Sequence, residues 1–370
     1  MNIEGKTIWQ QAAGDKDRNY VDVCLEWGVI LNGPGYLGPL DDATMRKLRE
    51  DGRSAKTINN LKSFKDGMKA GDMVVLRLGT DQVHAVGEVV GDYQWSSLFG
   101  DVDGWDIEHV RRVRWQWVAQ GSPKTFDSYT MKLGDTTQKL TSPEVKKWLE
   151  VLVPNVIDQE KALPEIPLEM EAGSTVPMAE LAEHMFDNGA SSTAINQFSA
   201  GVDELVRIYK WYGKDKKNRP SEHETVAYLV VPFLRALGWT PQRMAIEWGR
   251  IDVALFSKLP RIEENLACVV EVKNLDTSCL KAREQAKQYT EKWGPNCTRF
   301  IVTDGLRYGV YEKERDDFQL KAYMNLNRRY DKYAIYNCEG VRAAIMALTP
   351  ERISDPSVFG VTAERVEVEA

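Results

Sequence analysis

One segment in the second half of the chain carries apolar residues at the spacing of a helix face. In SEHETVAYLVVPFLRALGW, residues 221–239, they lie at Val226, Leu229, Val230, Phe233, Leu234 and Leu237. This spacing predicts a helix with one buried face, and Pro232 predicts a kink in it. Four residues earlier the same face reaches Glu222, whereas Glu224 falls on the opposite side. We therefore expect Glu222 to point into the domain.

Two apolar runs rich in β-branched residues follow this helix. RIDVALFS (250–257) and LACVVEVK (266–273) are joined by the polar connection KLPRIEEN, which predicts an antiparallel hairpin. The length of the connection allows Asp252 to lie opposite Glu271. Glu271 and Lys273 are two residues apart, so they project from the same face of an extended strand. Asp252, Glu271 and Lys273 should converge on one spot, which Glu222 approaches from the helix.

Carboxylate oxygens at such a spot suit Mg²⁺ or Mn²⁺, because Mg²⁺ binds through one or two carboxylates and keeps several waters. A neighbouring lysine can orient or help to deprotonate an attacking water, or stabilise negative charge on a phosphate. These parts together predict metal-assisted phosphodiester hydrolysis. An isolated Asp…Glu-x-Lys pattern also occurs in surface strands that carry a salt bridge, so the motif alone leaves that alternative open.

The order of these residues resembles the PD-(D/E)xK nuclease superfamily, written here as Asp252 and Glu271-Val272-Lys273. It resembles more closely the nuclease domain of type I restriction motor subunits, over about residues 220–315. The segment 221–239 is similar to the opening helix of that subgroup, REQAKQYTEKW carries its Gln-x-x-x-Tyr pair as Gln285 and Tyr289, and FIVTDGLRYGVYE is similar to its closing hairpin. The superfamily's proline before the aspartate is replaced by Ile251. No phosphate-binding loop of the type G-x-x-x-x-G-K-[ST] is present, so no nucleotide cofactor is expected.

The resemblance implies roles for five residues. Asp252 and Glu271 would hold the metal, and Lys273 would assist the water. Glu222 would support the site, and Gln285 would position the DNA strand or the site itself. A nuclease fold that has lost its activity and is retained for binding is the alternative.

The first 120 residues have a different pattern, with short β-branched runs between glycines and aspartates and six of the eleven tryptophans. This predicts a small, mostly β domain with a few helices. Three stretches resemble the EVE branch of PUA-like domains: Trp27-Gly28-Val29 leading into Asn32, Lys69-Ala70-Gly71-Asp72, and Val86-Gly87-Glu88-Val89. Similar domains flip a modified base out of nucleic acid and hold it in an aromatic cage.

Such a cage needs flat aromatic faces and polar groups at the edge of the base. The residues proposed for it are Trp27, Asn32, Tyr36, Trp95, Trp105 and Asp106. The tryptophans could instead pack the core of the domain. Arg111, Arg112 and Arg114 in HVRRVRW could contact DNA phosphates, although a solvated edge strand explains them equally well.

The segment between these regions predicts a connection. DQEKALPEIPLEMEAGSTVP (158–177) is acidic and contains prolines, which is typical of a linker, and residues 177–212 show helical apolar spacing. We expect an α+β, multidomain protein: a PUA-like β-barrel-type domain at 1–120, a helical and acidic linker region at 121–215, and an α/β/α restriction-endonuclease-like domain at 216–370. The helices at 177–212 are a candidate dimerisation surface.

Composition adds limits to the possible locations and partners. The five cysteines are scattered without a CxxC motif, no apolar run is long enough to cross a membrane, and the first residues lack the features of a signal peptide. We therefore expect a cytoplasmic protein. The net charge of −7 requires any DNA-binding surface to be local. The four histidines are dispersed and are expected to be structural or to lie on the surface.

The function expected from these resemblances is that of a modification-dependent restriction endonuclease. Its partner would be DNA that carries modified bases, probed through the PUA-like domain and cut with Mg²⁺ in anti-phage defence. Double-strand cleavage by single active centres would require a homodimer. The alternatives are a reader of modified nucleic acid that does not cleave it, and a nuclease that acts on RNA or tRNA.

Overall fold

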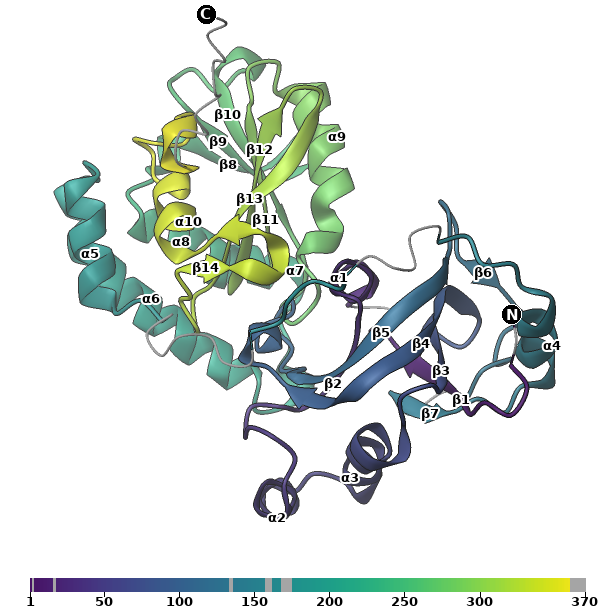
Figure 1. Cartoon of the computed structure of the whole chain (residues 1–370). Coiled ribbons are helices and arrows are strands. Elements are labelled where there is room, and N and C mark those ends of the chain that lie inside the picture. Colours follow the sequence, from purple (N-terminus) through teal and green to yellow (C-terminus); the bar gives the residue numbers. More distant parts are fainter. Residues whose placement is uncertain (2, 16–17, 133–135, 157–161, 168–174, 360–370) are drawn as a thin grey trace, which may run out of the picture. The chain divides into compact units, whose positions relative to one another are not determined.

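The computed structural model describes residues 1, 3–15, 18–132, 136–156, 162–167 and 175–359 (Figure 1). The chain divides into two compact units, Met1–Met170 and Glu171–Ala370. Both combine helices with strands, so the protein belongs to the α+β class. Part of the expected linker, at 157–161 and 168–174, lies outside the described residues. None of the helices within the described ranges has the length and apolar character needed to cross a membrane.

The described part of the N-terminal unit is built on a seven-stranded sheet. The sheet has the order β2-β5-β4-β3-β1-β7, with β6 paired to β4; β1 and β3 are parallel and the other pairs antiparallel. Its strands are β1 (Ile8–Ala12), β2 (Val29–Asn32), β3 (Met73–Leu78), β4 (Gln82–Trp95), β5 (His109–Val118), β6 (Lys124–Thr125) and β7 (Thr137–Lys139). The helices are α1 (Val21–Trp27), α2 (Asp42–Glu50), α3 (Ala55–Lys62) and α4 (Pro143–Val151).

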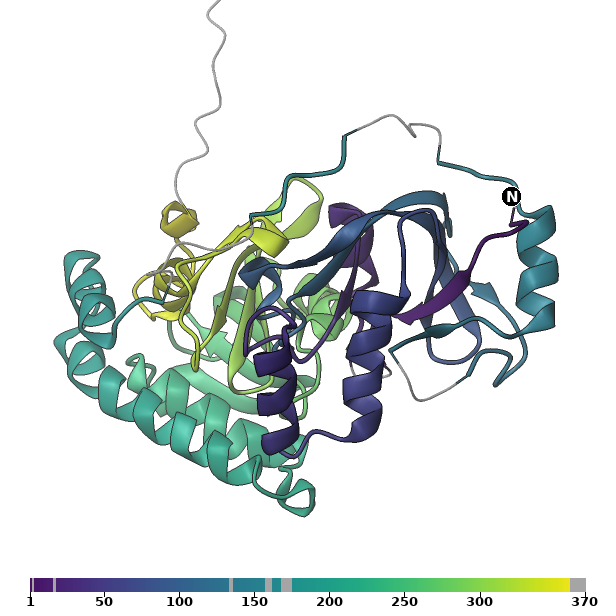
Figure 2. The same ribbon diagram turned by 60° about the horizontal axis from the view of Figure 1, so that its bottom comes forward.

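The N-terminal unit extends beyond the boundary expected at residue 120. Strand β7 pairs with β1, and Leu149 of α4 is fully buried in a core that also contains Val75 and Val86. Helices α2 and α3 lie side by side and share a smaller core around Leu48 and Leu61 (Figure 2). Residues 121–152 are therefore part of this domain and not of a linker, because their apolar side chains complete its core.

The C-terminal unit is built on an eight-stranded sheet within the described residues. The order is β14-β15-β13-β12-β11-β10-β9-β8, with β10–β11 and β13–β15 parallel. Its strands are β8 (Met244–Trp248), β9 (Ile251–Phe256), β10 (Leu266–Val272), β11 (Arg299–Thr303), β12 (Arg307–Glu314), β13 (Asp317–Asn325), β14 (Lys332–Tyr333) and β15 (Cys338–Glu339). The helices are α5 (Met178–Asp187), α6 (Ser192–Tyr212), α7 (Glu222–Thr225), α8 (Val231–Ala236), α9 (Arg283–Trp293) and α10 (Val341–Leu348).

Helices cover both faces of this sheet (Figure 1). One core joins Val253, Val270 and Val272 to helices α5, α6, α8 and α10. The other core joins Ala254 and Val269 to α9. Since side chains alternate along a strand, Glu271 shares the face of Val269 and points to the α9 side. The sheet is thus apolar on both faces, as a layer buried between helices requires.

The helix predicted from the apolar spacing is confirmed. Its six apolar residues are at most 5% exposed. The helix is continuous in register from α7 through a π-helical turn, η4 (Val226–Val230), into α8, where Pro232 occupies the first turn. The wider turn accommodates the missing N–H of Pro232, which is the physical basis of the predicted irregularity.

Helices α5 and α6 belong to the C-terminal unit. Leu181 of α5 and Phe198, Val202 and Leu205 of α6 are at most 2% exposed and lie in the same core as Val230 and Phe233. The placement of these helices in a separate linker region is therefore wrong, because their apolar face is needed to cover the sheet. Their expected role in dimerisation stays a prediction for the opposite, exposed face.

Candidate functional site

The strand register brings Asp252 and Glu271 together. Strands β9 and β10 pair antiparallel with Val253 opposite Val270 and Ala254 opposite Val269, so the next pair in this register is Asp252 and Glu271. Asp252 Oδ2 accepts a hydrogen bond of 2.7 Å from the backbone N–H of Val272. The hairpin predicted from the sequence therefore places both carboxylates at the same end of the sheet.

Glu271 is a buried carboxyl that lacks part of its hydrogen bonding. The residue is 1% exposed; its Oε1 accepts a hydrogen bond of 3.0 Å from Lys273 Nζ, whereas Oε2 is buried without a hydrogen-bond partner among the described residues. Burial, followed by the Asp252 carboxylate, raises the pKa of Glu271 to about 7, against the lowering effect of Lys273. Burial also raises the pKa of Asp252, opposed by the Val272 N–H, by Lys273 and by a hydrogen bond from the Glu271 carboxyl when it is protonated.

Lys273 links the carboxylates to helix α9. Its Nζ donates to Gln285 Oε1 at 3.2 Å as well as to Glu271, and Gln285 Nε2 lies 3.4 Å from the Tyr289 hydroxyl. The Lys273 side chain is 22% exposed, so its ammonium is held in place and still reaches solvent. Gln285 and Tyr289, which the resemblance pointed to, are one helical turn apart on α9 and face the end of β10.

Glu222 lies on the other side of Asp252. Both line a pocket of about 310 Å³ together with Val226, Ile246 and Glu247. Glu224 instead closes the start of the helix, because its carboxylate accepts from the Ser221 N–H at 2.8 Å while Ser221 Oγ caps Glu224 N. The prediction that Glu222, and not Glu224, points toward the site is confirmed.

The same pocket contains a histidine that the sequence did not assign to it. His223 lines the pocket, and its Nδ1 lies 3.0 Å from Glu247 Oε1. Glu247 has a positive φ of 53°, which an L-residue seldom adopts. His223 is a surface residue, as expected. Its position next to Glu222 in the sequence could have indicated that it also borders the pocket.

A buried turn fixes the positions of both the helix and the loop after Lys273. Asp304 is fully buried and forms an ion pair with Arg307, which also reaches Asp276 at 3.3 Å. Gly305, with φ +86°, packs so closely on the helix that a Cβ there would lie 2.7 Å from Leu229 Cβ. Sequence analysis identified the Asp304-Gly305 hairpin but not this supporting role.

The carboxylate pair fits a divalent cation. A buried carboxylate oxygen without a partner, beside a second carboxylate, is satisfied when a cation binds between them, and hard oxygens are the ligands that Mg²⁺ prefers. Among the described residues, no group of three or more His, Cys, Asp or Glu side chains is arranged to hold a metal. Asp252 and Glu271 would thus act as a pair, with the other positions taken by water or substrate.

The N-terminal unit has a pocket of its own, of about 300 Å³. It brings together three of the six residues predicted for the base pocket, Asn32, Trp105 and Asp106. Trp27, Tyr36 and Trp95 are not among the described residues that line it. Trp27 packs edge-on against Phe99, the Tyr36 hydroxyl donates to Asp51, and Trp95 Nε1 donates to Gly35 O at 2.9 Å.

Trp105 is the central aromatic side chain of this pocket. It makes an edge-on contact with Tyr20 at a ring separation of 5.7 Å, and the Arg18 guanidinium lies 5.0 Å from its ring centre. Tyr20 and Arg53 also line the pocket, and sequence analysis missed both. No local spacing relates them to Trp105, because they are brought together only by the folded sheet and its loops.

Asn32 has a structural role that was not expected. It is 1% exposed, and its Nδ2 donates to Asn60 Oδ1 at 2.7 Å and to Thr137 Oγ1 at 3.0 Å, while its Oδ1 accepts from Gly33 N. Both amide hydrogens are therefore used inside the fold. The prediction that Asn32 reads the edge of a base is corrected, because doing so would break a buried network.

Arg111 is also corrected. It is 2% exposed, and its guanidinium donates to the backbone carbonyls of Phe64 at 2.8 Å, Gly91 at 3.1 Å and Lys65. It joins the loop after α3 to the sheet and has no free face for a phosphate. Arg112 is half-buried and Arg114 is exposed, so for these two a phosphate contact stays a prediction.

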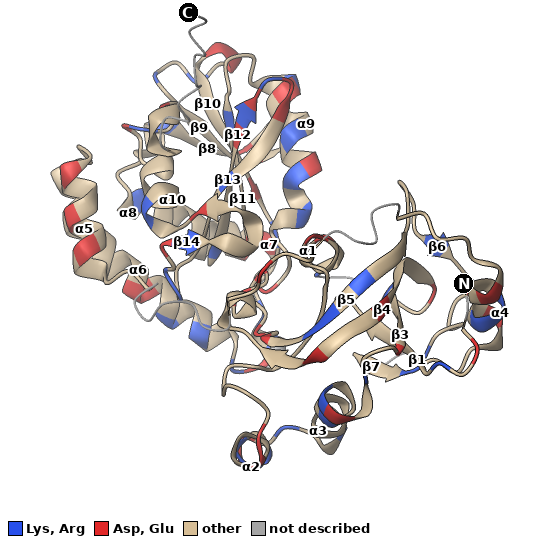
Figure 3. Ribbon diagram, viewed as in Figure 1, with Lys and Arg blue, Asp and Glu red and all other residues tan. Residues whose placement is uncertain are grey.

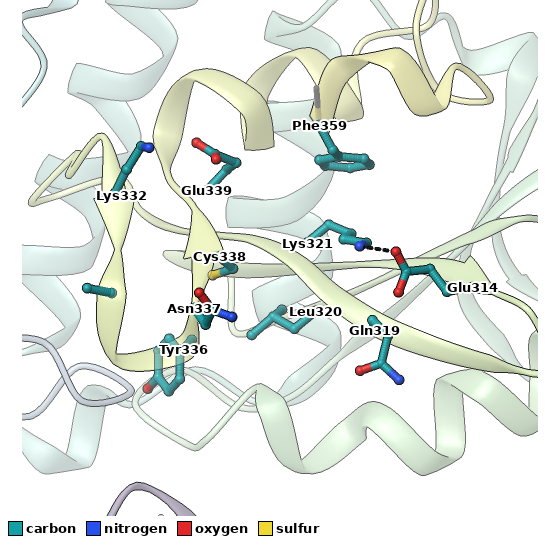
Figure 4. A pocket seen from close by; sticks show the side chains of 11 residues that line it. Glu314, Gln319, Leu320, Lys321, Lys332, Tyr336, Asn337, Cys338, Glu339 and Phe359 are labelled. Atoms are coloured by element: carbon teal, nitrogen blue, oxygen red, sulfur yellow. Dashed lines mark hydrogen bonds and ion pairs between the residues drawn. The ribbon is translucent and has the colours of Figure 1, made fainter. Parts of the chain in front are cut away.

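A larger pocket lies away from the carboxylate pair. It has a volume of about 540 Å³ and is formed by the β12–β13 hairpin, the β14–β15 segment and Phe359 (Figure 4). Its charges are mixed: Lys321 pairs with Glu314, and Lys332 and Glu339 also face the pocket. None of the five predicted catalytic residues is among its described lining residues, so its size alone gives it no role in the proposed chemistry.

Comparisons with known proteins bear on the N-terminal unit. A family model described as a domain of unknown function, DUF8426, matches residues 9–139. The match begins in β1 and ends with the last residue of β7, so it covers the strands of the N-terminal sheet. No curated protein matches the sequence. The match is consistent with a domain that extends past residue 120, and it assigns that domain no activity.

Proposed function

We propose that the protein is a Mg²⁺-dependent DNA endonuclease with a PD-(D/E)xK nuclease domain, which probes DNA for modified bases, expected to be modified cytosines, through a PUA-like domain. The observation that carries the proposal is the convergence of Asp252, Glu271 and Lys273, with Glu271 Oε2 buried and unpaired among the described residues. A purely structural salt bridge would not require a second carboxylate beside Glu271, since that carboxylate raises the cost of ionising it.

Asp252 and Glu271 would hold the cation. When bound, Mg²⁺ supplies Lewis acidity toward the phosphate and lowers the pKa of a bound water. The chain's own residues orient the reactants. Lys273 donates two hydrogen bonds to Glu271 and Gln285, which fixes its ammonium so that a third N–H can donate to the attacking water or to a phosphate oxygen.

The pocket beside Asp252 gives the substrate a place to lie. Its volume of about 310 Å³ is bounded by the apolar Ile246 and Val226 and by the charged Glu222 and Glu247. Glu222 also raises the pKa of Glu271, by less than burial and Asp252 do, so its charge acts on the carboxylate pair through space. Glu222 is therefore a positioning residue that adds negative charge at the site where a cation is expected.

The pocket of the N-terminal unit supports the sensing part of the proposal. A volume of about 300 Å³ is at the small end of ligand pockets and suits one extruded base. Trp105 and Tyr20 offer aromatic surface, while Asp106 and Arg53 offer polar groups. These residues replace Trp27, Tyr36 and Trp95 in the proposed base pocket.

Digestion of a panel of DNAs with Mg²⁺ tests the proposal. The panel contains unmodified, methylated, hydroxymethylated and glucosylated DNA and matched RNA. We expect cutting of one or more modified DNAs, and loss of cutting in Glu271→Ala and Lys273→Ala. Glu224→Gln is the matched control, because it lies near Glu222 and glutamine preserves the capping box.

Each outcome of the digestion has a separate meaning. Equal cutting of every DNA would remove the sensing role. Cutting that survives both substitutions would remove the assigned active site. Cutting of RNA and not of DNA would favour the nuclease acting on RNA or tRNA, and binding of modified DNA without any cutting would favour the non-cleaving reader.

A further inference from the structure

A short segment of the C-terminal unit is strongly basic although the chain as a whole is acidic. Residues 207–219, RIYKWYGKDKKNR, contain six lysines and arginines and a single acid, Asp215, in a chain of net charge −7. They form the end of α6 and the loop that leads to the Ser221 cap of α7. We call residues 207–219 the basic segment.

The cations of this segment are not used by the fold. Arg207, Lys210, Lys214, Lys217 and Arg219 are all exposed. Within the described residues none of the five forms an ion pair, whereas elsewhere in this unit Arg299, Arg307 and Lys287 are paired with carboxylates. Five unpaired cations close together repel one another, so a binding partner that carries negative charge would stabilise them.

The basic segment lies at the end of the helix pair that carries Glu222. Helix α6 packs antiparallel to the helix that contains α7 and α8. At the middle of α6, a Cβ on Gly201 would lie 2.9 Å from Ala236 Cβ. Toward its C-terminal end, Tyr212 is buried in the core that also contains Val226 and Leu229 of the partner helix. Figure 3 shows acidic residues on α5 and on the middle of α6, and basic residues toward the end of α6.

Aromatic surface accompanies the charge. Trp211 is 53% exposed and Tyr228 is 54% exposed, although large aromatic side chains are usually buried. Trp211 contacts Tyr212 at a ring separation of 5.0 Å, which anchors it to the helix. Exposed aromatic rings among lysines and arginines are typical of surfaces that bind nucleic acid, where cations contact phosphates and rings contact sugars or unpaired bases.

We propose that the basic segment binds the phosphate backbone of the nucleic-acid substrate and guides the strand toward the pocket of Glu222 and Asp252. This inference rests on the proposed function, because it names the surface that presents the substrate to that site. The cations are spread along the last residues of α6 and the loop that follows it and do not line one of the pockets described above, which matches a row of phosphates better than a single anion.

The test uses the full chain in EDTA, so that binding is measured without cleavage. The variant Lys210→Gln/Lys214→Gln/Lys217→Gln removes three cations of the basic segment. The control Lys258→Gln/Lys313→Gln/Arg315→Gln removes three exposed cations at the opposite end of the sheet, where the β9–β10 and β12–β13 connections lie. Fluorescence anisotropy with a labelled DNA duplex is measured at several salt concentrations, with a matched RNA in parallel.

We expect the affinity of the first variant for DNA to fall roughly ten- to a hundredfold and the slope of log K against log salt to fall by up to about 2.7, since each phosphate contact contributes about 0.9. The control should bind as the wild type does. Unchanged melting temperatures would show that both variants fold. If the triple variant does not fold, the double variant Lys214→Gln/Lys217→Gln, which changes only loop residues, replaces it. An equal effect on RNA would support recognition of phosphate itself.

Equal binding by both variants, or no DNA binding by the wild type, would overturn the inference. Failure of the proposed function has a different result: no cleavage with Mg²⁺ by the wild type, while the basic-segment variant still lowers binding and salt slope. Cleavage by the wild type and undiminished binding by the basic-segment variant would leave the active site in place and remove this surface alone.

Discussion

At the residue scale, local spacing predicted the side chains that act through neighbours on the same strand or helix. Glu271 lies in β10 and Lys273 directly follows it, two residues on, and Glu222 continues the stripe of a helix, so periodicity placed these side chains correctly. Asn32 and Arg111 were misassigned. Their partners, Thr137 and Phe64, are 105 and 47 residues away, and no local pattern shows that a polar side chain will be used by such a contact.

The first prediction concerns Glu271→Gln. We expect DNA cleavage to fall by roughly a hundredfold or more, because the amide is a poorer ligand for a divalent cation than the carboxylate. Mg²⁺ should stabilise the wild type against thermal unfolding, by about 1.4 kcal/mol at roughly ten times the Kd, and should not stabilise the variant. Melting temperatures with and without Mg²⁺ provide a measurement that is independent of activity.

The matched control for this prediction is Glu224→Gln, in which an exposed glutamate of the same unit is changed and both effects of Mg²⁺ should persist. Without divalent cations, Glu271→Gln should be at least as stable as the wild type, since it removes a carboxyl that is costly to ionise. Stabilisation of Glu271→Gln by Mg²⁺ equal to that of the wild type would contradict the assignment of Glu271 as a ligand.

The second prediction concerns His109 in β5. Its Nε2 donates to Pro34 O at 2.9 Å, and its Nδ1 lies 2.9 Å from the Tyr93 hydroxyl, from which the neutral ring can accept a hydrogen bond. Burial lowers the pKa of His109 from 6.5 to about 4, against the raising effect of the Pro34 carbonyl. The stability that this histidine contributes is thus fully present above pH 6.5 and is lost as the pH falls toward 4.

The loss should amount to about 3 kcal/mol across this range, following the value of 1.36 kcal/mol for each pKa unit. Hydrogen exchange of the β5 amides, corrected for intrinsic rates, measures it within the N-terminal unit. In His109→Gln the amide does not titrate in this range, so much of the pH dependence should disappear. The same pH dependence in His109→Gln and the wild type would show that other groups cause it.

At the element scale, strong apolar periodicity was sufficient to predict a helix or a strand, whereas irregularities within an element were harder to predict. The stripe from Val226 to Leu237 predicted the helix and Pro232 predicted a disturbance, but the π-helical form of that disturbance depends on how the backbone adapts to the missing N–H. The β9–β10 hairpin was predicted in register because apolar β-branched runs of similar length flank one polar connection. The tight packing of Gly305 on the helix could not be inferred from either pattern.

The third prediction concerns Gly305→Ala. Gly305 has φ +86°, and a Cβ there would meet Leu229 Cβ at 2.7 Å and Thr225 Cγ2 at 3.1 Å, so the turn and the helix of Glu222 must separate. We expect a loss of stability of about 2–5 kcal/mol, from left-handed strain of about 1–2 kcal/mol and overpacking of about 1–3 kcal/mol. The fraction of the variant that remains folded should also cleave DNA more slowly, because Glu222 moves with the helix.

Gly189→Ala is the matched control. Gly189 has a similar φ of +77° in the same unit, but nothing lies within 4 Å of the position of its Cβ. It should lose only the part due to backbone strain and keep the cleavage rate of the wild type. Chemical unfolding and cleavage assays compare the two variants, and equal losses in both would refute the claim that Gly305 positions the helix.

At the scale of the whole molecule, composition revealed two folded regions but misplaced their limits. The acidic, proline-containing stretch at 158–177 correctly marked the division between the units, which falls at residues 170 and 171. Boundaries at 120 and 215 were misplaced, because short strands such as β7 and exposed-looking helices such as α5 reveal their partners only in the folded sheet. The length of a helix and the spacing of its apolar residues do not show which core the helix completes.

The fourth prediction distinguishes the two sets of boundaries by truncation. A fragment that starts at residue 175 keeps α5 and α6, whereas one that starts at residue 216 lacks them and exposes the core around Phe198, Val202 and Leu205. Burial of an apolar side chain of this size contributes about 1.5–3 kcal/mol, so the loss of these three contacts is comparable to the usual stability of a whole domain. We expect the fragment 175–370 to unfold cooperatively and the fragment 216–370 to aggregate or to lack a thermal transition.

Circular dichroism during heating and gel filtration measure this difference. Adding back a peptide of residues 175–214 to the shorter fragment should restore part of the transition, because the same apolar face would again be covered; the variant peptide Phe198→Asp should not. A stable, monomeric 216–370 fragment with the melting temperature of the longer one would contradict the structure, since α5 and α6 would then be dispensable. Their inward faces would have to be reassigned to a partner, as the dimerisation hypothesis first suggested.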